Sequence, residues 1–307
     1  MCTSIALRKV KALFGRNMDI DYNFGESIVN TPRNFPLHFK KVGTIEKHYA
    51  FIGTAAMEDN FPLYAEAMNE NGLYIAALKF PENAYCNETQ TQGKINLAPY
   101  EIIPYVLSKC RNTSEALSLL SECQIVAIPF SDKLPLSPLH WHIADKGGSL
   151  TLEKTKDGMN IYHNPTDVLT NNPPFPFHLE NRGHYENLSP RNPENSDTAM
   201  LGLGTVGLTG DFTPVSRFIR MDYLVRNTPI NCDTVSHFFH ILDNAAIPKG
   251  AVVTPDGKYH FTSYSCCFDA DTLEMYFKTY ENTDIRTSKL TPDGNALLAL
   301  EMNNKLW

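Results

Sequence analysis

The sequence predicts an α+β fold in which two antiparallel sheets are covered by helices. Three observations support this prediction: short strand-like stretches fill the first third, two pairs of helical segments interrupt them, and strand-like stretches return at the end. The chain has 307 residues, of which 42% are hydrophobic and 20% charged, so it can bury a large core. Neither a repeat of fixed period nor an interdomain linker is visible, and we therefore expect one domain over residues 1–307.

The first third of the chain is expected to form strands joined by turns. Residues 5–7 and 12–14 flank a basic turn and predict a hairpin. The sequence Asn-Glu-Asn-Gly at 69–72 predicts another turn. Further strands are expected at 27–31, 49–53, 63–67 and 73–78.

Two helices are expected next, because residues 99–110 carry apolar side chains at helical spacing and a second such stretch runs from 113 to about 122. Thr113 is the expected N-cap of the second helix. Strand patterns return in four stretches: 124–128, 139–144, 149–153 and 159–162.

The stretch 171–195 is rich in Pro and Asn and predicts a loop. Two helices are expected after it, at 215–225 and 233–246. The last strands are expected at 260–268 and 273–280.

Charge and cysteine usage exclude several classes of protein. The formal charge of −7 and the absence of a dense Lys/Arg run argue against a nucleic-acid partner. Charges at residues 8–11 interrupt the apolar stretch that a signal peptide needs, and no stretch approaches the ~18 apolar residues of a membrane span. Seven cysteines without a CxxC motif favour reduced thiols. We therefore expect a cytoplasmic protein that does not insert into membranes.

Cys2 is the first candidate catalytic residue. Removal of Met1 would leave Cys2 with both a thiol and a free α-amino group. An α-amino group with a pKa near 8 can accept the proton of a thiol with a pKa near 8.5, so one residue would supply the nucleophile and the base.

Arg16 and Asp19 are expected at the end of the second strand of the hairpin that begins at Cys2. Paired strands lie about 4.8 Å apart, which brings this segment close to Cys2. An arginine beside a thiol favours the thiolate, and an aspartate can hold an amine in place. A surface ion pair at a turn is the alternative interpretation.

Cys2-Thr3 and Gly15-Arg-Asn-Met-Asp19 together resemble the choloylglycine hydrolase family of N-terminal nucleophile (Ntn) hydrolases. Two further motifs extend the resemblance over essentially the whole chain: Leu-Thr-Asn-Asn-Pro at 169–173 and Gly-Asp-Phe-Thr-Pro-Val-Ser-Arg-Phe-Ile-Arg at 210–220. The resemblance implies the four-layer αββα sandwich of Ntn hydrolases and a mature chain that begins at Cys2.

The resemblance also implies roles for individual residues. Cys2 would attack an amide carbonyl, Arg16 and Arg217 would lower the pKa of its thiol, and Asp19 would orient its α-amino group. Asn171 and the backbone N–H of Lys79 would bind the oxyanion, where one amide donor is worth roughly 3 kcal/mol. Neither a metal nor an organic cofactor is implied.

The substrate implied by the resemblance is a glycine- or taurine-conjugated bile salt, whose apolar part would contact Met18, Phe130 and Leu134. Penicillin V acylase activity is the alternative within the same chemistry, and a non-catalytic binder of acyl amides is the alternative outside it. A homo-oligomer, a tetramer in the family, is also implied.

Three positions depart from the family pattern. Lys79 stands where bile salt hydrolases usually have Asn and the penicillin-cleaving relatives often have Tyr. Glu58 stands where an aromatic pocket residue is expected. Asn172 stands where Ser is more common.

Two other patterns are not expected to mark sites. Gly-Leu-Gly-Thr-Val-Gly at 202–207 matches GxGxxG, but it precedes a loop and not a helix, so dinucleotide binding is not expected. The pairs His140/His142 and His237/His240 each lack a third metal ligand, and we expect these histidines in the core or on the surface.

Overall fold

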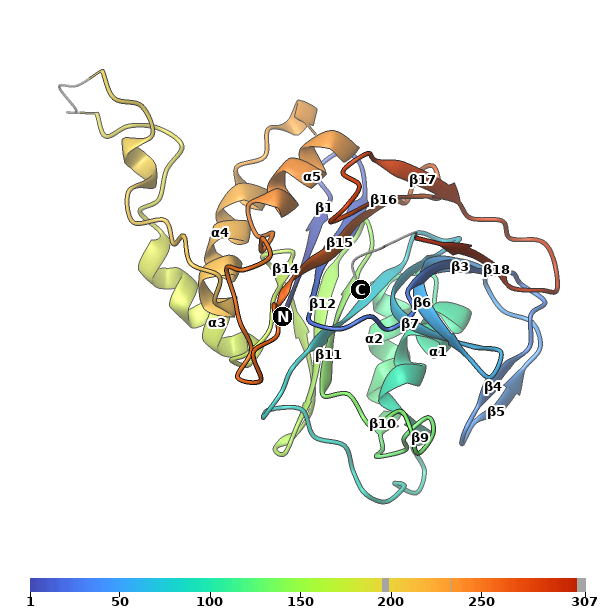
Figure 1. Ribbon diagram of the computed structural model, residues 1–307. Helices are drawn as coiled ribbons and strands as arrows, with labels where there is room; N and C mark the ends of the chain where they lie inside the picture. Colours follow the sequence, from blue (N-terminus) through green and yellow to red (C-terminus); the bar gives the residue numbers. More distant parts are fainter. Residues whose placement is uncertain (195–198, 233, 303–307) are drawn as a thin grey trace.

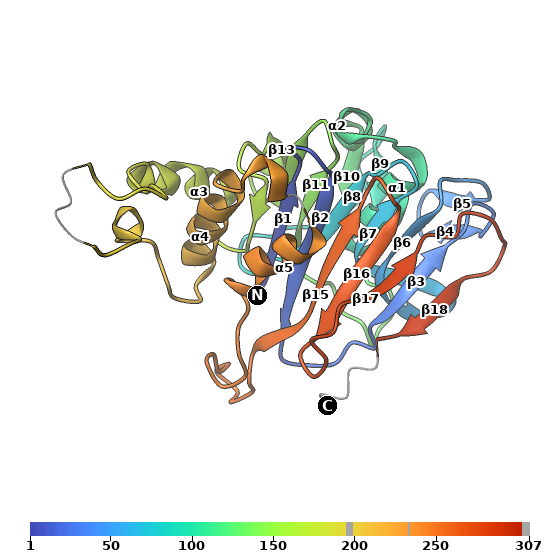
Figure 2. The same cartoon turned by 90° about the horizontal axis from the view of Figure 1, so that it is seen from above.

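A computed structural model describes residues 1–194, 199–232 and 234–302 of the chain. It has four layers, with two antiparallel sheets packed face to face and helices on both outer faces (Figures 1 and 2). The α+β prediction and the αββα sandwich implied by the resemblance are thus confirmed. In the described part of the chain, no helix is long and apolar enough to cross a membrane.

The first sheet contains the predicted N-terminal hairpin. Its six strands are, in spatial order, β14 (Val168–Leu169), β1 (Cys2–Leu7), β2 (Leu13–Ile20), β15 (Phe261–Asp269), β16 (Glu274–Thr279) and β17 (Arg286–Lys289). Strand β2 is longer than the expected 12–14, so the whole Gly-Arg-Asn-Met-Asp motif lies inside a strand and not after its end.

The second sheet has eight strands and faces the first. In spatial order they are β13 (Gly158–His163), β12 (Ser149–Thr155), β11 (Leu139–Ala144), β8 (Tyr74–Lys79), β7 (Phe61–Asn69), β6 (Phe51–Glu58), β3 (Ser27–Thr31) and β18 (Leu298–Glu301). Two small sheets lie beside it, formed by β4 (Leu37–Phe39) with β5 (Gly43–Ile45) and by β9 (Ile95–Leu97) with β10 (Cys123–Ile125).

Helices α1 (Ile102–Lys109) and α2 (Thr113–Ser121) pack on the outer face of the eight-stranded sheet. The N-cap of α2 is Asn112 and not Thr113. Asn112 has an extended backbone, and its side chain accepts a hydrogen bond from Glu115 N at 2.9 Å. The prediction of Thr113 as the cap was therefore wrong by one residue.

Helices α3 (Phe175–Arg182), α4 (Pro214–Arg226) and α5 (Val235–Asp243) lie on the side of the six-stranded sheet, and α4 and α5 pack on its outer face (Figure 2). Asp233, the expected start of the last helix, lies outside the described residues.

Helix α3 corrects the prediction of a continuous loop over 171–195. Pro174 occupies its N-cap position and Pro176 lies in its first turn, where a proline costs little because the first N–H groups have no partner inside the helix. The prolines that suggested a loop therefore mark the start of a helix. Asn195, the expected end of the loop, lies outside the described residues.

Residues 183–194 and 199–213 project from the body of the molecule between α3 and α4 (Figures 1 and 2). The second of these stretches contains the GxGxxG match, in which Leu203–Thr205 form one 3₁₀ turn. The described chain has no strand between β14 and β15, so these glycines do not form the strand-to-helix turn of a dinucleotide site.

The space between the two sheets forms one part of the core. Phe14 of β2 stacks on Tyr74 of β8 with ring centroids 5.7 Å apart, and Tyr74 also contacts Phe268 of β15 at 5.5 Å. The inner faces of both sheets are therefore held by aromatic packing next to the N-terminal strand.

Candidate active site

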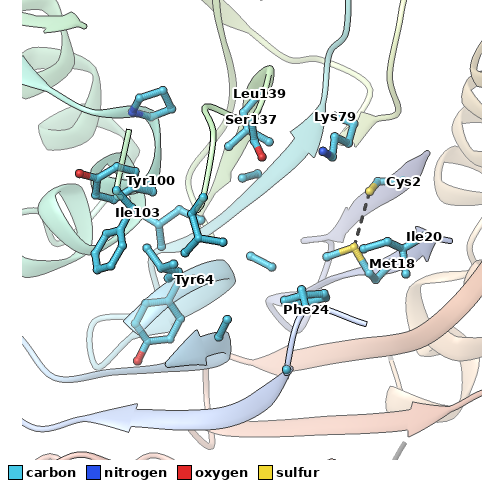
Figure 3. A pocket seen from close by; sticks show the side chains of 18 of the residues that line it. Cys2, Met18, Ile20, Phe24, Tyr64, Lys79, Tyr100, Ile103, Ser137 and Leu139 are labelled. Atoms are coloured by element: carbon cyan, nitrogen blue, oxygen red, sulfur yellow. Dashed lines mark hydrogen bonds between the residues drawn. The ribbon is translucent and has the colours of Figure 1, made fainter. Parts of the chain in front are cut away.

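The pairing of β1 with β2 places Cys2 beside the Gly-Arg-Asn-Met-Asp motif of the hairpin's second strand. Cys2 is opposite Met18 and Ser4 is opposite Arg16. Side chains alternate along a strand, so Cys2, Met18 and Arg16 share the face that looks toward the other sheet, whereas Asp19 lies on the face toward α4. The Cys2 Sγ lies 3.9 Å from the Met18 Sδ (Figure 3).

Arg217 and Asn171 hold the backbone of Cys2. The Cys2 N–H donates to Asn171 Oδ1 at 2.8 Å, and Arg217 Nη2 donates to the same oxygen at 2.9 Å. Arg217 Nη1 donates to the Cys2 carbonyl oxygen at 2.6 Å. Arg217 thus contacts Cys2, and its hydrogen bond is to the backbone and not to the thiol that the resemblance implied.

The Asp-Phe-Thr-Pro motif builds the start of α4 and so positions Arg217. Thr213 caps the helix by accepting from Ser216 N at 3.3 Å, and Arg217 Nε donates to Phe212 O at 3.0 Å. Burial lowers the pKa of Arg217, and the nearby Asp19 and Cys2 counteract this effect. Arg220, three residues on, instead donates to Asn244 O at 2.7 Å and connects α4 to the end of α5.

Asp19 has one carboxylate oxygen engaged and one that is open to a donor. Its Oδ1 accepts from Thr262 Oγ1 at 2.6 Å. Its Oδ2 lies 3.9 Å from Arg217 Nη1 and has no hydrogen-bond partner among the described residues. The open oxygen can accept a hydrogen bond from an amine.

The N-terminal amine belongs to Met1 in this chain. It donates to the Asp19 backbone oxygen at 3.1 Å and lies 2.6 Å from His260 Nε2. Burial lowers the pKa of this amine, and burial likewise lowers the pKa of His260 to about 4. The surroundings of the N-terminus therefore favour a neutral amine, which can accept a proton.

Arg16 is fully buried and extends across the space between the sheets. Its Nη1 donates to Ala77 O of β8 at 2.6 Å, and its Nη2 lies 3.6 Å from Met18 Sδ. Burial acts against the charge of Arg16, but Cys2 and a nearby carboxylate outweigh burial and raise its pKa. Arg16 is therefore a cation at every accessible pH, placed close to Cys2.

Lys79 ends β8, and its backbone contacts the side chain of Asn171. The next residue, Phe80, donates to Pro138 O of the neighbouring chain segment at 2.8 Å, which makes Lys79 and Leu139 a non-hydrogen-bonded pair. The N–H and C=O of Lys79 therefore both point away from β11. Its carbonyl accepts from Asn171 Nδ2 at 2.7 Å, so the Lys79 backbone and the Asn171 amide meet beside the thiol.

The loop that carries Asn171 is anchored on both sides. His178 of α3 donates through Nε2 to the Asn171 carbonyl oxygen at 3.0 Å. Asn172 Nδ2 donates to Pro81 O. Asn172, which replaces the more common Ser, thus connects the loop to the segment after Lys79.

A pocket of about 640 Å³ opens beside Cys2, between the two sheets and the loop 128–137 (Figure 3). The predicted pocket residues Met18, Phe130 and Leu134 all line it, as do Arg16 and Lys79. Sequence reasoning missed other lining side chains, among them Ile20, Tyr22, Phe24, Tyr64, Tyr100, Ile103 and Leu139. The alternation of apolar residues at 18, 20, 22 and 24 was a signal for part of this set.

Phe130 and Tyr100 line one wall of the pocket, and the Phe130 ring also packs against Phe61. The centroid of the Phe130 ring lies 5.9 Å from that of Phe61 and 5.4 Å from that of Tyr100. Lys40 Nζ lies 5.2 Å from the centroid of the Phe130 ring. Glu58 also lines the pocket, so at this position a carboxylate replaces the expected aromatic residue.

The histidines singled out in the sequence have structural partners. His142 is buried and bonds Ser4 and Ser149 through its two ring nitrogens, each at 2.8 Å. His140 stacks on Phe80 with ring centroids 4.3 Å apart. In residues 1–194, 199–232 and 234–302, no group of three or more His, Cys, Asp or Glu side chains is arranged to hold a metal ion.

Known proteins resemble this chain over nearly its whole length. Residues 2–296 match the model of a family described as linear amide C–N hydrolases, choloylglycine hydrolase family. The chain is 40% identical to a bile salt hydrolase/transferase of Lactiplantibacillus plantarum, over 94% of this chain and 92% of that protein. It is 37% identical to a bile salt hydrolase/transferase of Clostridium perfringens, over 100% of this chain and 98% of that protein.

Two solved structures have a fold similar to that of this chain. A crystal structure of a mutant conjugated bile acid hydrolase from Clostridium perfringens superposes with a TM-score of 0.91 at 35% identity, over 99% of this chain and 98% of that one. A penicillin V acylase from Agrobacterium tumefaciens superposes with a TM-score of 0.78 at 18% identity, over 99% of this chain and 92% of that one. The second similarity concerns the fold alone.

Proposed function

Because the chain belongs to the choloylglycine hydrolase family of linear amide C–N hydrolases, we propose that it hydrolyses the amide bond of bile salts conjugated to glycine or taurine. The observation that carries this proposal is a largely apolar pocket of about 640 Å³ with the Cys2 thiol at one end, within the size range of small-molecule sites. Full-length relatives named as bile salt hydrolases support the substrate class.

The nucleophile in this proposal is Cys2 after removal of Met1. The Cys2 nitrogen, now the α-amino group, takes the thiol proton, and the thiolate attacks the amide carbonyl carbon. The C–N bond then breaks while the α-ammonium gives its proton to the leaving amine. Water next gives a proton to the α-amine and attacks the thioester, which releases the acid and restores the thiol.

Three charged residues stabilise or orient the reacting groups of Cys2. Arg16 supplies positive charge on the pocket side of Cys2, and Arg217 supplies it on the side of the Cys2 carbonyl, 2.6 Å away. Asp19 Oδ2, which has no described hydrogen-bond partner, accepts from the α-ammonium and orients it.

The oxyanion is bound by the Lys79 N–H and by Asn171 Nδ2. Both groups face the same space, because Asn171 Nδ2 already donates one hydrogen to the Lys79 carbonyl at 2.7 Å and keeps a second hydrogen. Donors fixed in this way need no reorganisation when charge develops on the carbonyl oxygen.

Penicillin V acylase activity is the second candidate, since that reaction uses the same nucleophile and an aromatic acyl group could lie against the Tyr100 and Phe130 rings. A non-catalytic binder of acyl amides would keep the pocket but would not need the thiol, the two arginines and the open carboxylate oxygen together.

We also propose a cytoplasmic homo-oligomer, a tetramer as in the family. The projecting residues 199–213 present exposed apolar side chains, among them Leu201 (92% exposed) and Val206 (76% exposed), which a partner subunit would cover. All seven cysteines are free thiols, which suits a reducing compartment.

The proposal is tested by assaying the purified enzyme on glycocholate, taurocholate and penicillin V. We expect a higher kcat/KM for the two bile salts. Cys2→Ala should abolish turnover without loss of fold, and Cys2→Ser should lower kcat by several orders of magnitude, because a hydroxyl is far less acidic than a thiol. Preference for penicillin V would favour the second candidate, and turnover by Cys2→Ala would contradict the mechanism.

A further inference from the structure

A buried ion pair connects the two sheets next to Cys2. Arg16 of β2 and Glu66 of β7 face each other, with Arg16 Nη1 3.5 Å from Glu66 Oε2 and neither side chain exposed (0% each). Burying two charges costs more than packing apolar side chains of similar size, so the pair adds little to stability unless further hydrogen bonds satisfy both groups.

The carboxylate of Glu66 receives those bonds from the opposite sheet. Tyr264 OH donates to both Glu66 oxygens, at 3.0 Å each, and Cys266 Sγ lies 3.6 Å from Glu66 Oε1. Burial raises the pKa of Glu66, whereas Arg16, Tyr264 and Cys266 all act to keep it ionised. β15 thus supplies two donors that stabilise a carboxylate on β7.

The guanidinium of Arg16 lies between this carboxylate and the thiol. Its Nη1 also donates to Ala65 O at 3.3 Å, next to Glu66 in the chain. Its Nη2 is directed to Met18 Sδ at 3.6 Å, and the same sulfur lies 3.9 Å from Cys2 Sγ. The buried Arg16 cation can therefore interact with two groups that can be anionic, Glu66 and the Cys2 thiolate.

This geometry, together with the proposed role of Cys2, leads us to infer that Glu66 is a positioning residue for the reaction. Its carboxylate holds Arg16 between the sheets and partly neutralises the positive charge of the guanidinium. Glu66 therefore limits how strongly Arg16 stabilises the Cys2 thiolate. The limit matters because a more stabilised thiolate is a weaker nucleophile.

The other titratable groups that face the pair do not change charge near neutral pH. Burial raises the pKa of Tyr74 on β8 and of Tyr264 and Cys266 on β15 well above their ordinary values, so all three stay protonated. A change in the pH at which Cys2 ionises would therefore reflect a change in the charges of Arg16 and Glu66.

The experiment is the pH dependence of iodoacetamide labelling of Cys2 in purified enzyme. Glu66→Gln keeps the size of the side chain and removes its charge, which leaves the thiolate as the main anion beside Arg16. We expect the labelling midpoint to fall by about one pH unit, and kcat to fall with little change in KM. Arg16→Gln should move the midpoint upward.

Two further variants make the test independent of folding defects. Tyr264→Phe removes one donor from the carboxylate, favours its protonation, and should lower the midpoint by less than Glu66→Gln. Glu101→Gln is the matched control, because this buried carboxylate accepts from Lys40 N at 2.6 Å and Ala98 N at 2.8 Å, and we expect no shift.

The inference is overturned if folded Glu66→Gln keeps the wild-type midpoint, or, should that variant not fold, if Tyr264→Phe keeps it. If the labelling midpoint shifted as much in Glu101→Gln as in Glu66→Gln, the inference would also be overturned, since the effect would then not depend on Arg16. Failure of the proposed function looks different, because wild-type enzyme would then not hydrolyse glycocholate or taurocholate, whatever the labelling midpoints of the variants.

Discussion

The backbone and the side chain of Lys79 have separate roles in the proposed reaction. Its N–H points away from β11 toward the oxyanion, and this donor is the same for any residue except proline. Its ammonium lines the pocket beside Cys2, 6.0 Å from the centroid of the Tyr22 ring (Figure 3). The carboxylate of glycine or the sulfonate of taurine must lie near this position when the amide reaches the thiol.

We therefore expect Lys79→Asn to affect KM more than kcat. Loss of a partly exposed charge pair costs on the order of 1 kcal/mol, or about a fivefold rise in KM for glycocholate and taurocholate at low ionic strength. The change in kcat should stay below about tenfold. Steady-state kinetics at low and high salt measures both effects, and the KM difference should shrink as salt increases.

Lys40→Asn is the control for this prediction, since Lys40 carries the same charge near Phe130 but does not line the pocket. An unchanged KM in Lys79→Asn at low salt would show that the Lys79 side chain does not contribute to substrate recognition. A collapse of kcat would mean that the ammonium itself acts on the oxyanion.

The sequence predicted the residues around Cys2 that lie in short motifs, but not those that act from distant strands. Arg16, Asp19 and Arg217 belong to motifs that can be matched one by one. Glu66 and Thr262 carry no local pattern, because their contacts with Arg16 and Asp19 depend on how β7 and β15 approach β2. Such contacts follow from sheet packing and not from sequence spacing.

At the scale of elements, β2 and β15 lie unusually close at Gly15. A Cβ atom on Gly15 would lie 2.0 Å from the Cys266 backbone oxygen, and backbone atoms of a central strand cannot move aside cheaply. Gly15 is therefore required for the pairing that places Arg16, the next residue, between the sheets.

We expect Gly15→Ala to separate β2 from β15 and to destabilise the protein by several kcal/mol, as overpacking in a core does. Activity should fall even in the folded fraction, because Arg16 moves with the strand. Thermal unfolding together with kcat of the folded protein measures both effects. Gly183→Ala is the control, since a Cβ there meets no atom within 4 Å. Equal stability of the two variants would show that the strands can adjust.

The elements that the sequence missed are those with weak periodicity or misleading composition. Helix α3 was hidden by Pro174 and Pro176, which are compatible with a helix start. Strand β18 is an edge strand exposed along its whole length, so no buried face marks it in the sequence. Strand β14 has only two residues, and its pairing with Ser4 and Ile5 of β1 defines it.

At the scale of the whole molecule, buried neutral histidines connect folding to pH. Burial lowers the pKa of His142 to about 3 and that of His178 to about 4. Both values lie below the ~6.5 of an unfolded chain, so the unfolded state binds these protons first as the pH falls. Stability from these residues is complete above pH ~6.5 and decreases as the pH drops toward the folded-state values.

We expect the free energy of unfolding to lose up to about 1.4 kcal/mol per pH unit through His142 alone below pH ~6. His142→Gln should remove that part of the slope, whereas His184→Gln, at an exposed position, should leave it unchanged. Urea unfolding at pH 7, 6 and 5 gives the slopes. Identical slopes in His142→Gln and wild type would show that His142 is protonated in the folded state.

The central claim is that the mature chain begins at Cys2 and that its thiol is the nucleophile. The Cys2 nitrogen lies 2.8 Å from Asn171 Oδ1, an acceptor that a free amine can use. Peptide mass spectrometry of active enzyme, partly alkylated with iodoacetamide, tests the claim most directly. We predict an N-terminal peptide that starts at Cys2, with an alkylated fraction equal to the fraction of activity lost. Fully active enzyme that retains Met1 would contradict the claim.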